Sequence, residues 1–227
     1  MGMVAKFHQI SPHQLSEFLL DPSSAYDYTM SPFYDNPTAI EQAEKMLDEL
    51  RIKTAGFPPA VRGQVEHVAG LLRRKSNARK GPQLIPSKPK LELTRKDFSL
   101  EKDWHVLHYA LNGTHDSGTG LLADAILGGQ EIPDVEGVNS FGGGSSGALR
   151  YLTAPQVRNV ATALREVEPT QLLSKLDVKD AQEKRIYLAH TLENLSDWEY
   201  LPELFVSFRQ FYSDAADSGN AMLLSIA

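Results

Sequence analysis

The sequence predicts an α+β fold, in which a small sheet containing the N- and C-terminal strands is covered by several helices. Residues 3–10 alternate loosely between apolar and polar side chains, and residues 221–226 form a second short, mainly apolar run. Between them, apolar residues recur at helical spacing in one segment after another. Strands at both ends with helices between them favour a sheet in which the terminal strands pair.

The first helix is predicted to begin at Ser11. A serine N-cap followed by proline, with Gln14 at the third helical position, is a strong signal for a helix start. Asp21 precedes a proline and therefore predicts the end of this helix. Residues 26–36 are aromatic and rich in turn formers, so we expect an ordered loop there. Thr38 then begins a second capping box.

Residues 51–96 are predicted to form an insertion within a single domain that spans residues 1–227. Phe57 and the two prolines after it begin a helix with apolar residues at helical spacing. Three prolines within residues 81–89 exclude regular structure, because each removes a backbone donor and fixes φ. Residues 73–96 hold nine basic side chains against one acidic side chain, and we expect this stretch to be a flexible, solvated linker.

The clearest pattern in the chain is a helix expected from Ser99, as its N-cap, to Gly113, as its left-handed C-terminal residue. Its inner face carries apolar, aromatic and imidazole side chains at helical spacing, namely Leu100, Trp104, Leu107, His108 and Leu111. A short helix over residues 120–127 is expected to follow and to stop at Gly128 and Gly129.

The remaining elements follow similar signals. Residues 139–147 are rich in glycine and predict a flexible loop. Thr153 begins a third capping box ahead of an amphipathic helix. Shorter helices are expected over residues 172–176 and 181–187. The last helix is expected to close at Gly219 and to lead into the C-terminal strand.

The composition limits the class of protein. The chain has 227 residues, of which 41% are hydrophobic and 23% are charged, as in a typical soluble globular protein. It has no cysteine, which excludes disulfides, thiol catalysis and cysteine-based zinc sites. The sequence shows neither an apolar run of about 18 residues nor a signal-peptide pattern, so we expect a cytoplasmic protein that contacts no membrane.

Charge is distributed unevenly along the chain. The net charge is −6, but residues 73–96 contribute +8, which leaves −14 for the rest. An acidic body of this kind favours a basic protein partner and repels nucleic acid. The basic segment also contains no Phe, Tyr or Trp on which bases could stack, which further argues against nucleic-acid binding.

Several short motifs occur in a characteristic order. They are the opening Met-Gly-Met-Val, the helix Trp104-x-x-Leu107-His108-Tyr109-x-Leu111-x-Gly113, the turn Ala125-Ile126-Leu127-Gly128-Gly129, the segment Arg150-Tyr151-Leu152-Thr153 and the closing strand Gly219-Asn220-Ala221-Met222-Leu223-Leu224. In these motifs, over residues 1–50 and 97–227, the chain resembles the YfbM-like family of uncharacterised bacterial proteins, a domain-of-unknown-function family. The resemblance implies an α+β fold and a bacterial cytosolic protein, and it transfers no catalytic residue.

Two histidines of the central helix raise the question of a metal site. His105 and His108 lie three residues apart, and His115 with Asp116 could supply further ligands. Packing is the competing interpretation, because His108 lies on the apolar face beside Trp104 and needs only a backbone acceptor. We favour packing, and we expect neither a metal nor a cofactor.

Polar groups around the same helix define a candidate pocket. The loop 114–120 is polar and precedes a helix, where backbone N–H groups attract anions, although a plain connecting turn has the same composition. Arg150 could bind a carboxylate or phosphate, or it could hold its own loop through Glu131 or Asp134. The candidate pocket consists of Trp104, His108, His115, Asp116, Arg150 and Tyr151.

Two functions therefore remain. The first is a non-enzymatic binding protein whose acidic body recognises a basic protein partner, for example as an inhibitor of a toxin. The alternative is a small enzyme or ligand-binding protein that uses the candidate pocket. The sequence contains no recognisable nucleophile–base or metal motif, which favours the first function. It leaves the oligomeric state open.

Overall fold

The structure, a computed structural model, describes residues 3–34, 96–133, 148–189 and 194–226, together with 45, 48–49, 51–53, 56 and 66. The chain divides into two compact units, residues 1–25 with 95–227 and residues 26–94. In the second unit, Arg51 forms ion pairs with Asp48 at 3.0 Å and with Glu66 at 2.7 Å. Within the described ranges, no helix has the length and apolar character needed to cross a bilayer.

A sheet of five antiparallel strands, within the part of the chain that the structure describes, forms the centre of the first unit. Its strands lie in the order β2-β1-β5-β4-β3, with bounds β1 (Ala5–Ile10), β2 (Lys96–Glu101), β3 (Gln130–Glu131), β4 (Arg150–Leu152) and β5 (Ala221–Ile226). Strand β1 pairs with β5 along its whole length. The prediction of an α+β fold with paired terminal strands is therefore confirmed.

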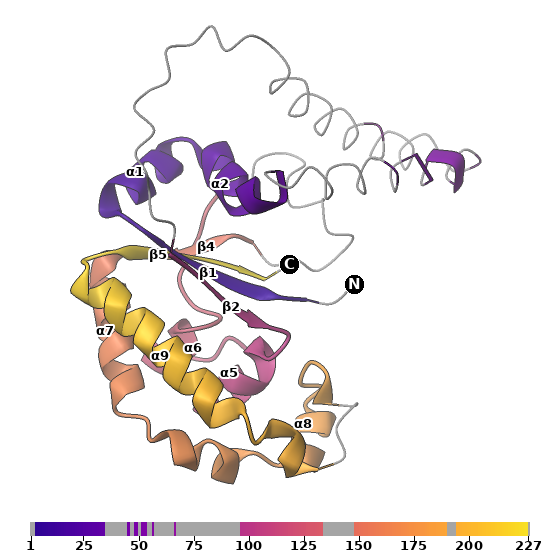
Figure 1. Cartoon of the computed structure of the whole chain (residues 1–227), viewed down its shortest axis with the longest axis vertical. Coiled ribbons are helices and arrows are strands. Elements are labelled where there is room, and N and C mark those ends of the chain that lie inside the picture. The colour runs from indigo at the N-terminus through magenta and orange to yellow at the C-terminus, as the bar shows by residue number, and fades with distance from the viewer. Residues whose placement is uncertain are drawn as a thin grey trace, which may run out of the picture. The chain divides into compact units, whose positions relative to one another are not determined.

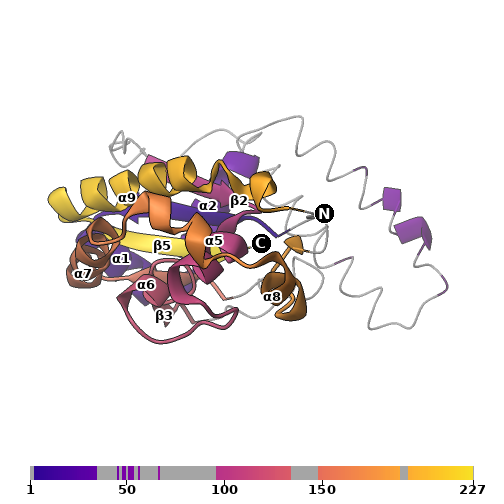
Figure 2. The ribbon, with the colours of Figure 1, turned by 90° about the horizontal axis from the view of Figure 1, so that it is seen from below.

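Helices lie on both faces of this sheet. Those of the first unit are α1 (Pro12–Leu20), α5 (Trp104–Asn112), α6 (Leu121–Asp124), α7 (Ala154–Arg165), α8 (Val178–Glu183) and α9 (Leu201–Asp217). Short 3₁₀ turns lie at η2 (Pro169–Gln171), η3 (Leu173–Lys175) and η5 (Leu195–Trp198), and α2 (Pro22–Tyr34) runs into the second unit. Helices α7 and α9 pack side by side against one face of the sheet, and α1 lies on the other (Figures 1 and 2).

The main core lies between the sheet and the pair α7 and α9. Phe7 of β1 packs edge-on against Phe208 and Tyr212 of α9, with ring centroids 5.2 and 6.5 Å apart. The buried Tyr212 hydroxyl donates to the carbonyl of Ala125 at 2.8 Å. Leu107 of α5 is fully buried in the same cluster. The core therefore anchors α5 and the turn after α6 against the sheet.

Predicted helix boundaries agree with the structure where a cap defines them. The Gln14 N–H donates to the Ser11 hydroxyl at 3.1 Å, and the Ser11 N–H donates to the Gln14 side chain at 2.9 Å. The Thr153 N–H donates to the Gln156 side chain at 2.8 Å in the corresponding cap of α7. Gly113, with φ +69°, ends α5 as expected. These caps use short-range hydrogen bonds, which is why the sequence alone predicts them.

Two predicted elements are wrong. Residues 26–34 belong to helix α2, because Pro22 occupies the first helical position of a new helix directly after α1 ends. Ser99 lies in β2 and does not cap a helix, since α5 begins only at Trp104. Leu100 and Trp104 are both buried, so a strand followed by a helix satisfies the same apolar spacing that we assigned to one helix.

Three short elements differ in extent. Helix α6 covers only 121–124 of the expected 120–127. The 172–176 segment forms part of the 3₁₀ turns, and the helix expected at 181–187 is α8, at 178–183. Other predictions lie outside the described residues, namely the capping box at Thr38, the helix after Phe57, the proline stretch 81–89 and the loop 139–147. Most of the insertion 51–96 and of its basic part, 73–96, also lies there, so both stay predictions.

Candidate functional site

Helix α5 positions the aromatic and imidazole side chains of the candidate pocket. Trp104 is 6% exposed and His108 is 0% exposed, which confirms the prediction that both side chains are buried. The helix ends at Gly113, where a left-handed residue turns the chain back into the loop 114–120. His105 and His108 therefore face the loop that follows their own helix.

The two histidines hold consecutive residues of that loop. The Nε2 atom of His105 lies 3.0 Å from the carbonyl oxygen of His115, and Nε2 of His108 lies 2.6 Å from that of Asp116. A carbonyl oxygen only accepts hydrogen bonds, so each Nε2 carries the proton and donates it. The loop is thus tied to α5 at two successive carbonyls.

The second nitrogen of each ring faces a donor. The Tyr187 N–H donates to Nδ1 of His105 at 2.9 Å, and the Asn112 side-chain amide lies 3.4 Å from Nδ1 of His108. Burial lowers the pKa of both histidines. A second proton on either ring would occupy Nδ1, which could then no longer accept from the donor that faces it. At neutral pH both imidazoles are therefore uncharged in the folded protein.

All four ring nitrogens of His105 and His108 already face a partner, which disfavours a metal site at these residues. Binding a metal through His105 or His108 would require the loss of a hydrogen bond to backbone or to Asn112. No group of three metal-ligating side chains converges among the residues that the structure describes. The expected absence of a metal stays a prediction, and this geometry supports it.

The neutral histidines predict a pH-dependent stability. In the unfolded chain both rings titrate near their ordinary pKa of about 6.5, whereas the folded protein keeps them neutral to lower pH. Their contribution to stability is therefore complete above about pH 6.5 and is lost as the pH falls towards the lowered pKa values. We expect the melting temperature to fall between pH 7 and pH 5.

A glutamine at position 108 isolates this effect, since its amide can still donate to Asp116 but does not titrate. We expect His108→Gln to flatten the dependence of melting temperature on pH. The exposed His13 provides the control, and His13→Gln should leave the dependence unchanged. An unchanged slope in His108→Gln would contradict the account.

Trp104 joins three segments of the first unit. Its indole stacks on His105, with ring centroids 4.6 Å apart, and on Tyr187 at 6.2 Å. The Met3 N–H donates to the Tyr187 hydroxyl at 2.9 Å. The indole Nε1 is buried and has no hydrogen-bond partner among the described residues. The stack therefore connects α5, the turn after α8 and the chain just before β1.

Two polar clusters are not apparent from the sequence. The Tyr109 hydroxyl donates to the Asp180 carboxylate, and Lys184 donates to the same carboxylate at 2.7 Å. Burial raises the pKa of Tyr109, and the Lys184 hydrogen bond lowers the pKa of Asp180. At neutral pH Tyr109 is therefore uncharged and Asp180 is negatively charged. In the second cluster, His8 Nδ1 lies 2.8 Å from an Asp97 carboxylate oxygen. Only the four-residue spacing of Asp180 and Lys184 was visible in the sequence.

Arg150 and Tyr151 are engaged on the sheet. Arg150 donates to the Leu127 carbonyl at 2.5 Å and to the Glu131 carboxylate at 2.8 Å. The Tyr151 hydroxyl donates to the Gln130 side chain. Of the two roles considered for Arg150, holding its own loop through Glu131 is the one that the structure bears out. The structure brings His108, His115 and Asp116 together, and Trp104 stacks on the neighbouring His105. Arg150 and Tyr151 instead contact β3 and the turn before it.

The negative charge of the chain is concentrated in the first unit. Residues 1–25 and 95–227 contain 21 acidic and 12 basic side chains, a net charge of −9, whereas residues 26–94 carry +3. The excess of carboxylates lies on the surface, because the buried polar and charged side chains of the described residues are His8, Gln9 and His108, none of which is acidic. The first unit is therefore acidic on its outside.

One face of α9 shows this acidity most clearly. Its inner side buries Leu201, Phe205, Phe208, Phe211, Tyr212 and Ala215. Its outer side, with the residue at the end of η5, forms what we call the acidic face, which consists of Glu199, Glu203, Val206, Ser207, Gln210, Asp214 and Asp217. Among the described residues, Glu199 and Glu203 form no ion pair, and Asp217 lies 3.9 Å from Arg165.

Arg209, the only basic residue of α9, does not neutralise the acidic face. Arg209 is partly buried, donates to the carbonyl of Val167 at 3.2 Å and lies 5.5 Å from the ring centroid of Phe205. Its guanidinium thus contacts Val167 and the ring of Phe205, and does not extend over the acidic face. No exposed Lys or Arg of α9 offsets the carboxylates of the acidic face.

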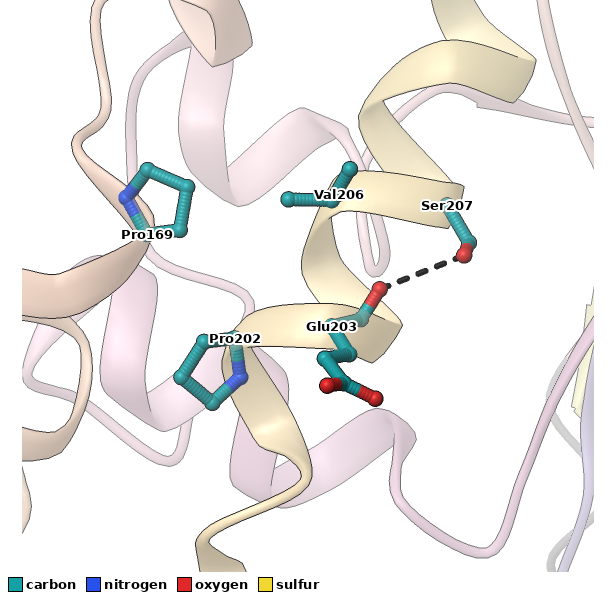
Figure 3. Close-up of a pocket in the computed structure, with 5 residues that line it drawn as sticks. All are labelled: Pro169, Pro202, Glu203, Val206 and Ser207. Atoms are coloured by element: carbon teal, nitrogen blue, oxygen red, sulfur yellow. Dashed lines mark hydrogen bonds between the residues drawn. The ribbon is translucent and has the colours of Figure 1, made fainter.

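A hollow of about 360 Å³ lies on the acidic face, next to η2. It is lined by Pro169, Pro202, Glu203, Val206 and Ser207, and its walls are mainly apolar. Figure 3 shows Pro169 on one side and Pro202 and Val206 across from it, with Glu203 and Ser207 farther from Pro169. Val206 is 43% exposed, so its side chain adds apolar surface to the hollow.

Together, the sheet of paired terminal strands and the helices packed on it define an α+β protein whose central polar groups are engaged in its own structure. The chain belongs to the family described as a domain of unknown function, DUF1877, whose model matches residues 1–225. The resemblance to the YfbM-like family is therefore confirmed.

A solved structure supports the same fold. The chain is similar to YfbM from Escherichia coli, described as a protein of unknown function, with a TM-score of 0.51 and 15% sequence identity over 99% of each chain. At this identity the likeness concerns the fold alone. A search of curated proteins found no match.

Proposed function

We propose that this chain is a non-enzymatic binding protein whose acidic body recognises a basic protein partner. The observation that carries the proposal is the acidic face of α9, where Glu199 and Glu203 lack cations among the described residues and Arg209 is withdrawn. Opposite charges on two proteins accelerate encounter and select the partner. Inhibition of a basic toxin is one role of this kind.

The compartment and the class of partner belong to the same proposal. The complete lack of cysteine suits a reducing compartment, and we place the protein in the cytoplasm. The net charge of −9 on the first unit disfavours nucleic acid and anionic membranes as partners of its surface. A basic protein is the remaining macromolecular class that this surface fits.

The alternative function, a small enzyme or ligand-binding protein using the candidate pocket, stays a prediction. The observation in its favour is the buried Nε1 of Trp104, which has no hydrogen-bond partner in the described part of the chain. The engagement of His105 and His108 with the loop carbonyls weighs against it, because a catalytic imidazole needs a nitrogen within reach of substrate.

Binding of a short arginine- and lysine-rich peptide tests the proposal. We expect the full-length protein to bind it at low salt, measured by fluorescence anisotropy, and the affinity to fall as salt rises. Removal of two charges in Glu199→Gln/Glu203→Gln should weaken binding by about fivefold, which corresponds to roughly 1 kcal/mol.

The matched control removes the same number of charges elsewhere. Glu17 and Glu183 are exposed residues of α1 and α8, so Glu17→Gln/Glu183→Gln should change the affinity by less than about twofold. An equal loss in both double variants would show that the α9 face is not the binding surface. Failure of the wild-type protein to bind the peptide at low salt would overturn the proposed function itself.

A further inference from the structure

We infer that the hollow beside η2 receives an arginine side chain of the basic partner. This inference rests on the proposed function and adds to it the kind of side chain that anchors the complex. Pro169, Pro202 and Val206 provide apolar walls, and Glu203 and Ser207 provide the polar groups. A mainly apolar hollow with one carboxylate has the composition of a site for a long cationic side chain with an apolar stem.

The Glu203 carboxylate is available to accept hydrogen bonds from a partner. Glu203 forms no ion pair among the described residues, and its carboxylate is exposed. The Ser207 hydroxyl donates to the Glu203 backbone carbonyl at 3.2 Å, so the Glu203 carboxylate is the acceptor that remains for a partner. A carboxylate has two acceptor oxygens, which match a group with several N–H donors.

The helix explains Glu203 itself but not the apolar side chain beside it. A carboxylate in the first turn of α9 interacts favourably with the helix dipole, by about 0.3–1 kcal/mol. That effect accounts for an acidic residue, and both prolines stand in the first turn of their helices, where proline is favoured. Neither effect requires an exposed apolar side chain, Val206, beside the carboxylate. A basic partner that covers Val206 and pairs with Glu203 would use both groups at once.

Arginine suits this hollow better than lysine. Its guanidinium is flat and weakly hydrated, so it can lie against proline rings and Val206 while donating two parallel hydrogen bonds to Glu203. The lysine ammonium is compact and strongly hydrated, and it would lose more hydration for one hydrogen bond at a time. The hollow should therefore discriminate between two peptides of equal charge.

The test compares an arginine-rich with a lysine-rich peptide of the same length and charge. We expect the wild-type protein to bind the arginine peptide about fivefold more tightly. Val206→Phe fills the hollow without changing the charge, and it should lower the arginine affinity to that of lysine while leaving the lysine affinity unchanged. Gln210→Phe is the matched control, because Gln210 is exposed on the same face of α9 but does not line the hollow.

Each outcome decides the inference. Equal affinity of the wild-type protein for both peptides, or an arginine preference that survives Val206→Phe, would overturn the arginine site while leaving the proposed function standing. The same loss of preference in Gln210→Phe would show that the hollow is not the discriminating element. Absence of binding to either peptide would overturn the proposed function and the inference together. Circular dichroism of each variant verifies that it is folded.

Discussion

Replacement of Trp104 by alanine is expected to destabilise the protein by about 3–5 kcal/mol, the usual cost of truncating a buried large aromatic side chain. The indole is 6% exposed and stacks on both His105 and Tyr187, so its removal leaves a cavity where α5 meets the turn after α8. Urea denaturation followed by circular dichroism measures the change.

An exposed leucine provides the control for this substitution. Leu20 is 88% exposed at the end of α1, and Leu20→Ala should change the free energy of unfolding by less than about 0.5 kcal/mol. A Trp104→Ala variant as stable as Leu20→Ala would show that the indole does not belong to the core.

The second large effect is expected at Gly129. This residue has φ +91°, and a Cβ atom there would lie 2.5 Å from the carbonyl oxygen of Tyr151. Gly129→Ala therefore combines an unfavourable backbone conformation with a clash against β4, and we expect a cost of roughly 3–4 kcal/mol. Thermal and urea denaturation of the variant provide the measurement.

Substitution of Gly113 separates the cost of the backbone conformation from the cost of the clash. This glycine also has positive φ, at +69°, but nothing lies within 4 Å of the position that a Cβ would occupy. Gly113→Ala should therefore cost only the backbone term of about 1–2 kcal/mol. Equal destabilisation by the two substitutions would mean that the close approach to Tyr151 does not matter.

Local patterns were sufficient to predict much of the fold. The capping boxes at Ser11 and Thr153, the helix end at Gly113 and the pairing of the terminal strands depend on short-range hydrogen bonds or on apolar runs visible in the sequence. The boundary between β2 and α5 was not predictable in this way. Leu100 and Trp104 both face the core, and apolar spacing alone does not distinguish one helix from a strand followed by a helix.

The candidate site was predicted less completely than the fold. Burial of His108 follows from its place on an apolar helix face, but the acceptors of the two imidazoles are backbone carbonyls, which every residue has and no motif marks. The Tyr109–Asp180 contact joins residues 71 positions apart. The hollow likewise combines η2 with α9. Only the three-dimensional fold shows these groups together.

The most direct test of the central claim is to map the bound peptide on the protein by NMR. With the arginine-rich peptide added to the ¹⁵N-labelled full-length chain, the account predicts that amide shift changes concentrate at residues 199–217 and around η2. It also predicts that residues 104–120 stay nearly unchanged, because their polar groups are engaged with one another. Shift changes concentrated at 104–120 would contradict the account and would assign function to the candidate pocket instead.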